Sequence, residues 1–156
     1  MTGTTDFIKD DGGRMAAGFR GRTGDCVCRA VAIASGRPYK EVYQRLALGN
    51  QQQRRSKNDR GPRKKSAADG ILTGRKWFMD YMTELGFVWT PTMTVGSGCK
   101  VHLRADELPA GRLVCRVSKH LVAMIDGVIH DNFNPDRGGT RCVYGYYKLE
   151  YPSTDC

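Results

Sequence analysis

The stretch GDCVCRAVAIASG, residues 24–36, decides how this sequence folds. It joins two cysteines to a run that is apolar on most sides of a helix, as is typical of a helix buried in a core. Asp25 precedes the run as a candidate N-cap, and Gly36 follows it as a residue suited to end a helix in the left-handed conformation. The stretch therefore predicts a central, buried helix that begins at Cys26.

Three roles are open to Cys26 in the first turn of this helix. The helix dipole and the unpaired backbone amides favour the thiolate, which is the nucleophilic form. Free cysteine is also among the most buried residue types, so the side chain could simply pack in the core. A zinc site could combine Cys26 and Cys28 with Cys99 and His102. Because Cys28 lies about 200° further around the helix, the first two side chains diverge, and we expect Cys28 to be structural and no metal to bind.

Size and composition predict one cytoplasmic domain. The chain has 156 residues, enough for one hydrophobic core, so we expect a single domain over residues 1–156. Its 40% of hydrophobic residues is ordinary for a globular protein, and no apolar run is long enough to cross a bilayer, so no membrane partner is expected. The first residues are too polar for a signal peptide. In the cytoplasm the six irregularly spaced cysteines should be mostly reduced.

The order of the expected elements predicts an α+β fold, with helices first and an antiparallel sheet after them. Apolar spacing predicts further helices over residues 38–48 and 77–85. The β-rich runs RLVCRVS, HLVAMI, VIHDNF and RCVYGYYKLEY follow within residues 112–151. Residues 1–24 carry little periodic apolar pattern, so we expect an irregular segment there, with a short structured piece near residues 15–19.

The Asp-Gly pair at residues 126–127 predicts a tight hairpin between two of these strands. Such a turn sets Ile125 opposite Val128. His120 begins the first strand and Asp131 ends the second, so both lie toward the same open end of the hairpin. A histidine and a carboxylate on adjacent strands, facing a helix N-terminus that bears a thiol, would complete a Cys-His-Asp triad. The alternative is a hydrogen-bonded surface pair without a catalytic role.

Each member of such a triad has a definite task. Cys26 would be the nucleophile, His120 the general base and then acid, and Asp131 the residue that orients the imidazole. Asn132 and Asn134 are substitutes for Asp131. Strand alternation disfavours Asn132, because it turns that side chain to the opposite face.

The order of these motifs resembles that of papain-like cysteine peptidases: a cysteine that begins a central helix, a histidine that begins a strand, and an acidic residue on the next strand. GDCVCRAVA is similar to the nucleophile motif of ovarian-tumour-type deubiquitinases, Asp-Gly-Asn-Cys-Leu-Phe-Arg-Ala, which Cys26, Arg29 and Ala30 match. HLVAMIDGVIHDNFNP is similar to the His-to-Asp hairpin of bacteriocin-processing peptidases, matched by His120 and Asp131. The C-terminal half also resembles small papain-fold proteins encoded by phages and mobile elements.

This resemblance spans roughly residues 14–147 without the basic segment. It implies a papain-like fold and a cysteine hydrolase that acts on a peptide or protein substrate without a cofactor, in the host cytoplasm if the gene belongs to a phage. The same triad also serves acyltransferases and amidases. Papain-type enzymes have an oxyanion-binding glutamine where this chain has Arg20, and the deubiquitinase motif has an aspartate at the position of Thr23. Arg20, Arg22 and Thr23 are therefore candidates to bind the oxyanion with the backbone amide of Cys26.

A basic segment interrupts the apolar pattern over residues 49–70, where we expect an exposed, flexible loop. It supplies much of the net charge of +9, and Arg54, Arg55, Lys64 and Lys65 within it are candidates for binding a substrate or partner. The segment lacks the interleaved aromatic residues that stack on bases, so nucleic acid is possible but not favoured. The alternative to an enzyme is a basic binding module that grips nucleic acid or an acidic host protein and has a vestigial thiol site.

Overall fold

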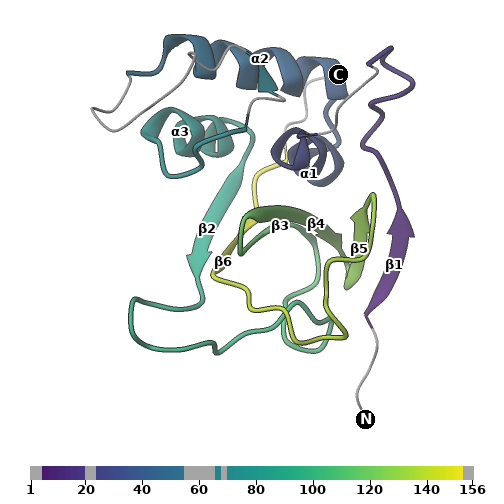
Figure 1. The fold of residues 1–156 in the computed structure, drawn as a ribbon, viewed down its shortest axis with the longest axis vertical. Helices are drawn as coiled ribbons and strands as arrows, with labels where there is room; N and C mark the ends of the chain where they lie inside the picture. The colour runs from purple at the N-terminus through teal and green to yellow at the C-terminus, as the bar shows by residue number, and fades with distance from the viewer. Residues whose placement is uncertain (1–4, 20–23, 55–65, 68–69, 153–156) are drawn as a thin grey trace.

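The structure of the protein is a computed structural model that describes residues 5–19, 24–54, 66–67 and 70–152. In this part of the chain the backbone forms three α-helices and a six-stranded sheet (Figure 1). The elements, in chain order, are β1 (Asp6–Lys9), α1 (Cys26–Ser35), α2 (Tyr39–Gln52), α3 (Lys76–Glu84), β2 (Phe87–Pro91), β3 (Arg112–Val117), β4 (His120–Ile125), β5 (Val128–Asp131) and β6 (Gly145–Leu149). None of these described helices has the length and apolarity needed to cross a bilayer. The structure is mixed α+β, as the order of the patterns predicted.

The strands form one sheet in the order β1-β5-β4-β3-β6-β2. Neighbouring strands are antiparallel except β1 and β5, which run parallel, with Asp6 opposite Val128. Strand β1 corrects our expectation of an irregular segment over residues 1–24. The strand has only four residues, and its Ile8 side chain is exposed, so the sequence offers no clear alternation of apolar and polar residues there. The segment is a strand because the edge of β5 offers backbone groups with which it can pair. The sheet is consequently mixed and not wholly antiparallel.

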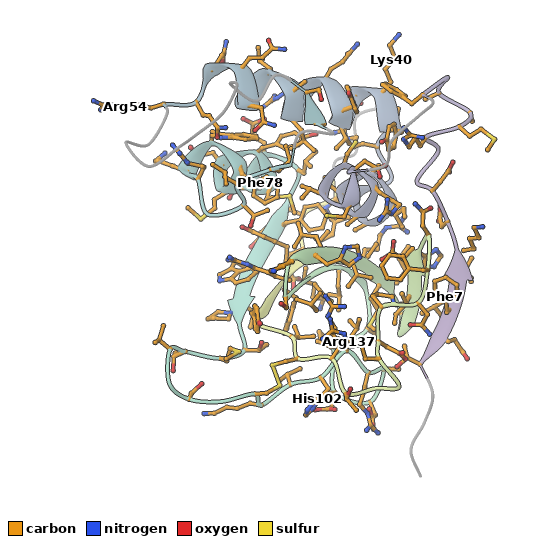
Figure 2. All side chains as sticks on the ribbon, in the orientation of Figure 1. Phe7, Lys40, Arg54, Phe78, His102 and Arg137 are labelled. Carbon is orange, nitrogen blue, oxygen red and sulfur yellow. A yellow bond between two sulfur atoms is a disulfide. The ribbon has the colours of Figure 1, made fainter. Side chains whose placement is uncertain are left out.

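The helices cover one face of the sheet, where α1 packs on β4 and β3 and α2 lies outside it (Figure 1). Residues 27–34 of α1 are all buried, as expected of a helix that is apolar on most sides. Phe78 of α3 points into the same layer (Figure 2), where its ring meets that of Tyr147 edge-on at 6.1 Å. This layer is the main hydrophobic core, and it holds the first turn of α1 against the sheet.

Helix α1 has the bounds that the sequence predicted, Cys26–Ser35. Gly36 ends it in the left-handed conformation, with φ of 75°. Asp25, in contrast, makes no side-chain cap bond, so the predicted capping role is wrong. Its carboxylate oxygens accept hydrogen bonds from Arg29 and Tyr39 instead.

Helix α2 is longer than predicted and continues to Gln52, so the first residues of the predicted loop over 49–70 are helical. The prediction ended this helix before Gly49. In the structure Gly49 lies within the helix, and a Cβ at that position would overlap the ring of Trp77, so the glycine allows this ring to pack against the helix. Residues 55–65 of the predicted loop lie outside the described part of the chain.

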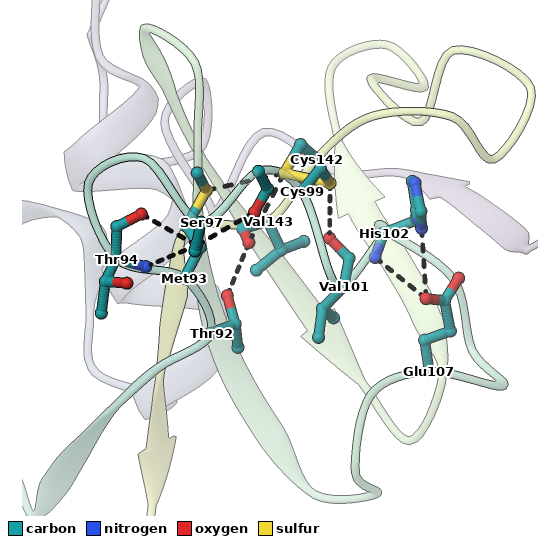
Figure 3. Close-up of a disulfide and its surroundings, with 11 residues drawn as sticks. Thr92, Met93, Thr94, Ser97, Cys99, Val101, His102, Glu107, Cys142 and Val143 are labelled. Atoms are coloured by element: carbon teal, nitrogen blue, oxygen red, sulfur yellow. Dashed lines mark hydrogen bonds and ion pairs between the residues drawn. A yellow bond between two sulfur atoms is a disulfide. The ribbon is translucent and has the colours of Figure 1, made fainter.

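Two long loops cover the opposite face of the sheet and are joined by a disulfide (Figure 3). Cys99 lies between β2 and β3 and Cys142 between β5 and β6, 43 positions apart, with their Cα atoms 5.8 Å from each other. This disulfide contradicts the expectation that these cysteines are reduced. The packing of the two loops brings the two thiols together, and their spacing in the sequence did not indicate that they would pair. Cys26, Cys28 and Cys115 are free thiols.

A second hydrophobic cluster fills the layer between the sheet and these loops. Its buried members are Leu103, Leu108, Leu113, Cys115, Val117, Val122, Met124, Ile129 and Val143. The middle residues of β3 and β4 are therefore buried on both faces of the sheet, which makes this part of the sheet a rigid support for side chains at its end.

Candidate active site

The sheet topology brings the three predicted triad residues together. Cys26 is the first residue of α1, His120 the first of β4, and Asp131 the last of β5. Because α1 packs across β4, and β4 pairs with β5, the three side chains meet at one end of the sheet. His120 Nε2 lies 2.7 Å from Asp131 Oδ2, and the side chains of Cys26 and His120 border the same compartment.

The hairpin that carries the histidine and the carboxylate has the predicted register. Ile125 pairs with Val128. Both residues of the turn at 126–127 have positive φ, 48° and 81°, which is the backbone of a type I′ turn. His120 and Asp131 consequently lie at the open end of the hairpin, as the turn predicted.

The surroundings of Cys26 favour its thiolate. Burial raises the pKa of the thiol, but hydrogen bonds with the His120 side chain and the Leu121 backbone outweigh this effect, and the positive charges of His120 and Arg29 add to them. The resulting pKa lies below the ordinary 9.0 of a cysteine. A thiol whose pKa is lowered by a neighbouring histidine is typical of an activated nucleophile.

His120 is held in the imidazolium form. Burial lowers its pKa, whereas hydrogen bonds to Asp131 and Cys26, together with the negative charges of both, raise that pKa to about 9. Because Nε2 is engaged by Asp131, Nδ1 is the ring nitrogen left for the thiol. The Phe133 ring lies beside the imidazole, 5.6 Å between centroids and tilted by 30°. These contacts favour the pair of a thiolate and an imidazolium over the neutral thiol and imidazole.

Arg29 connects α1 to this triad, although sequence reasoning assigned it no role. It is only 5% exposed, and its Nη2 and Nε lie 2.9 Å and 3.0 Å from Asp131 Oδ1. Its Nη1 lies 2.6 Å from Asp25 Oδ1, and the other oxygen of Asp25 accepts a hydrogen bond from the Tyr39 hydroxyl at 2.7 Å. A buried chain of polar contacts therefore runs from Tyr39 to His120.

The sequence did contain a signal for Arg29. A buried charge needs a partner, so an arginine in an otherwise apolar helix predicts a carboxylate close by in the fold. Asp25 and Asp131, which are 2% and 1% exposed, are those carboxylates. The use of Asp25 by Arg29 also explains why Asp25 does not cap the helix.

Cys28 and the two asparagines lie outside this constellation. The Cys28 sulfur lies 3.8 Å from the backbone carbonyl of Tyr39, and burial raises its pKa to about 12, so it is a buried thiol turned away from Cys26, as predicted. Asn132 contributes its backbone N–H to Asp131 Oδ1 at 2.7 Å. The side chain of Asn134 accepts a hydrogen bond within its own loop. The carboxylate therefore remains the partner of the histidine.

A cleft of two compartments opens beside the thiol. The first, of about 270 Å³, is lined by Cys26 and His120 among others. The second, of about 410 Å³, shares Thr73, Arg116 and Leu121 with the first. The second compartment is lined mainly by apolar side chains, which include Met79, Phe87, Val88, Trp89 and Tyr147. The thiol consequently borders an elongated cleft whose far end is apolar.

Several predicted binding residues lie outside the described part of the chain, namely Arg20, Arg22, Thr23, Arg55, Lys64 and Lys65. The side-chain oxyanion donors and most of the basic segment therefore stay predictions. Arg54 is described and exposed, and its backbone carbonyl accepts a hydrogen bond from Arg75 at 2.6 Å. At the start of α1, the first helical bond runs from the N–H of Arg29 to the carbonyl of Asp25, so the amide of Cys26 is not used within the helix.

The side chains considered for zinc do not converge. Cys99 is bound to Cys142, and His102 Nδ1 lies 3.2 Å from a carboxylate oxygen of Glu107 (Figure 3). In the described ranges no three His, Cys, Asp or Glu residues lie close enough together to hold a metal ion.

Comparison with known proteins assigns no family to the chain. No protein-family model, no curated protein and no solved structure matches it. The geometry around Cys26 is therefore the basis for a functional proposal.

Proposed function

We propose that this protein is a cysteine hydrolase of papain-like fold that cleaves a peptide or isopeptide bond with Cys26, His120 and Asp131. The observation that carries the proposal is that Cys26 and His120 border one compartment while a buried carboxylate, Asp131, lies 2.7 Å from the histidine. The lowered pKa of the thiol and the raised pKa of the histidine agree with it. The other described free thiols behave differently. Burial raises the pKa of both Cys28 and Cys115 to about 12, so the activation is specific to the thiol that borders the cleft.

The proposed reaction is acyl transfer in two steps. The thiolate of Cys26 attacks the carbonyl carbon of the substrate, and a C–S bond forms as that carbon becomes tetrahedral. The imidazolium of His120 gives its proton to the leaving amine as the C–N bond breaks. His120 then takes a proton from the water that attacks the thioester, so that the acid leaves and the thiolate is restored. Asp131 orients the ring and stabilises its charged form throughout.

The N-terminus of α1 suits the oxyanion of the tetrahedral state. The backbone amide of Cys26 has no helical partner, and the helix dipole adds positive potential at that point. Preorganised donors of this kind are a large part of the rate enhancement in acyl transfer. Arg20, Arg22 and Thr23 stay the candidates for a second donor.

The cleft favours a peptide-sized substrate over a small amide. Its two joined compartments offer room for groups on both sides of a reacting bond. In the apolar compartment the rings of Trp89 and Tyr147 lie 4.8 Å apart between centroids, and they form a surface for a large apolar side chain.

A fluorescent activity-based probe for cysteine hydrolases tests the proposal. The probe should label the wild type at Cys26 and fail to label Cys26→Ala. Cys28→Ala is the matched control, because it removes a thiol from the same helix that burial keeps protonated, and its labelling should persist. Equal labelling of the wild type and Cys26→Ala, or labelling through Cys28, would remove Cys26 from the mechanism.

Transfer to an amine is the alternative outcome inside the same chemistry. Up to the thioester the steps are identical, and only the second acceptor differs. Incubation with peptide, ubiquitin-like and acyl-thioester substrates, with and without an added amine, separates the two by product mass. Release of the acid alone supports a hydrolase, whereas an amide product identifies an acyltransferase.

If the protein is instead a basic binding module with a vestigial thiol, two variants should behave differently from what the hydrolase proposal predicts. Deletion of residues 51–65 should then abolish function, and Cys26→Ala should leave it intact. The hydrolase proposal predicts the reverse, since its chemistry depends on the thiol.

A further inference from the structure

Two basic side chains line the same compartment as the thiol. Arg116 lies near the end of β3, and Lys119 lies in the two-residue turn between β3 and β4. Both border the compartment that contains Cys26 and His120. Arg116 pairs across the sheet with Leu121, and these two residues also border the apolar compartment. The two cations therefore lie along the cleft that leads to the thiol.

Neither of these cations is neutralised within the described part of the chain. Other arginines there are engaged: Arg29 binds two carboxylates, and Arg112 donates to two backbone carbonyls. Arg116 and Lys119 have no ion pair and no side-chain hydrogen bond among the described residues. The described lining of the two compartments also contains no Asp or Glu. Unpaired cations in a cleft without acidic residues present a positive potential to whatever enters.

The backbone at Lys119 has a conformation that lysine rarely adopts. Its φ is 56°, in the second position of a two-residue turn that closes on the pair of Val117 and His120. Glycine and asparagine are favoured at such a position, so the stability of the turn does not account for a lysine. Unfavourable backbone conformations of this kind concentrate at active sites and ligand clamps.

We propose that Arg116 and Lys119 form an anion subsite beside the thiol, which recognises a carboxylate that the substrate carries next to its scissile carbonyl. The inference rests on the proposed hydrolase function and extends it by naming the substrate class: peptides with an acidic side chain or a free C-terminus at that place. A carboxylate suits the pair, because a guanidinium binds it through two parallel hydrogen bonds and an ammonium adds a second charge.

Two alkylating reagents of nearly equal size test the subsite without requiring turnover. Iodoacetate carries a carboxylate and iodoacetamide a neutral amide; with either, the thiolate attacks the CH₂ carbon, a C–S bond forms and iodide leaves. The rate constant of Cys26 with iodoacetate divided by that with iodoacetamide, both followed by peptide mapping, measures the preference for an anion. We expect this ratio to fall about threefold to tenfold in Arg116→Gln and in Lys119→Gly, since each removes one charge near the thiol.

Lys40→Gln is the matched control for these variants. Lys40 is exposed on α2, on the outer side of the helical layer (Figure 2), and its loss changes the net charge by the same amount. The ratio in Lys40→Gln should equal that of the wild type. Lys119→Gly should also show an unchanged or higher midpoint of urea denaturation, because glycine suits the turn, so a lower ratio cannot be attributed to unfolding. An unchanged ratio in both subsite variants would overturn the proposal.

Peptide binding to Cys26→Ala identifies the source of the carboxylate. One peptide has an internal Glu and an amidated C-terminus, a second has Gln and a free C-terminus, and a reference has Gln and an amide. Tighter binding of either acidic peptide, lost in Arg116→Gln, supports the subsite and names the source, whereas equal binding of all three overturns it.

The same peptides separate this inference from the proposed function. If the wild type hydrolyses none of them while Cys26→Ala still prefers a carboxylate, the hydrolase function fails and the subsite stands. If hydrolysis depends on Cys26 but shows no preference for a carboxylate, the function stands and the subsite fails.

Discussion

Arg29 joins the helix of the thiol to the carboxylate of the histidine: its Nη2 lies 2.9 Å from Asp131 Oδ1 in a buried ion pair. Asp131 therefore has a guanidinium on one oxygen and the imidazole of His120 on the other. A second buried pair, 2.6 Å between Arg29 Nη1 and Asp25 Oδ1, anchors the arginine itself. In the proposed mechanism Arg29 is thus a positioning residue, which acts through Asp131 and not on the substrate.

Arg29→Met should destabilise the protein strongly. It removes the buried cation that Asp25 and Asp131 share, so that among the described residues Asp25 keeps only the longer ion pair of 3.8 Å to Arg14, and Asp131 keeps only the one with His120. Breaking a buried ion pair in this way costs about 3–5 kcal/mol in the free energy of unfolding. Urea denaturation measures this loss. Arg37→Met, which removes an exposed pair with Glu41, is the matched control and should cost less than about 1 kcal/mol. Equal losses in the two variants would contradict the role given to Arg29.

The alkylation of Cys26 by iodoacetamide should rise with pH through a pKa below the ordinary 9.0 of a thiol. In His120→Gln the midpoint should move upward, because burial still raises the pKa of the thiol while its hydrogen-bond partner and that partner's charge are lost. The pH dependence of the alkylation rate gives both midpoints. A wild-type midpoint at or above 9.0, or no change in His120→Gln, would exclude the proposed ion pair.

Hydrolysis should decline above about pH 9, where His120 loses the proton that it gives to the leaving amine. Alkylation needs only the thiolate and should not decline there. Asp131→Asn should lower the upper limit of the hydrolysis profile, because the charge of Asp131 helps to raise the histidine pKa. A parallel decline of both reactions above this pH would point to unfolding and contradict the assignment.

The same histidine links stability to pH. Its pKa is raised from 6.5 to about 9 in the folded protein, so its contribution to stability is fully present below pH 6.5 and is lost as the pH rises through 9. Urea denaturation between pH 6 and 10 should show this loss in the wild type and a smaller one in His120→Gln. An equal loss in both proteins would assign the effect to other groups.

Reduction of the disulfide between Cys99 and Cys142 should lower the free energy of unfolding by about 2–4 kcal/mol, because the bond closes a loop with a sequence separation of 43. The double variant Cys99→Ser, Cys142→Ser should show the same loss and no further effect of dithiothreitol. The disulfide lies on the face of the sheet opposite α1, so the alkylation profile of Cys26 should persist in the double variant. A wild-type midpoint that reductant does not change would contradict the pairing.

Gly49→Ala should destabilise the protein even though alanine is the better helix former by about 1 kcal/mol. The added Cβ would overlap the ring of Trp77, and such overpacking costs about 1–3 kcal/mol. In a Trp77→Ala background the same substitution should become stabilising. Urea denaturation of the four proteins of this cycle measures the change of sign, and its absence would show that the ring does not lie against the helix.

Local patterns were sufficient for the elements that carry the candidate site. Apolar spacing and Gly36 predicted the bounds of α1, and the Asp-Gly turn predicted the register that puts His120 and Asp131 at one end of a hairpin. Both predictions depend on contacts within a few residues, since a helical bond spans four positions and a two-residue turn sets its own register. The sequence by itself therefore determined where the thiol, the imidazole and the carboxylate lie on their own elements.

Only the tertiary structure decided what surrounds them. Strand β1 exists because β5 offers it an edge, and Cys99 meets Cys142 because two loops fold over the same face of the sheet. Arg29 finds its carboxylate 102 positions away, where no local pattern marks the partnership. Such contacts leave no periodic signal, because their energy comes from burial and pairing that exist only once the whole chain has folded.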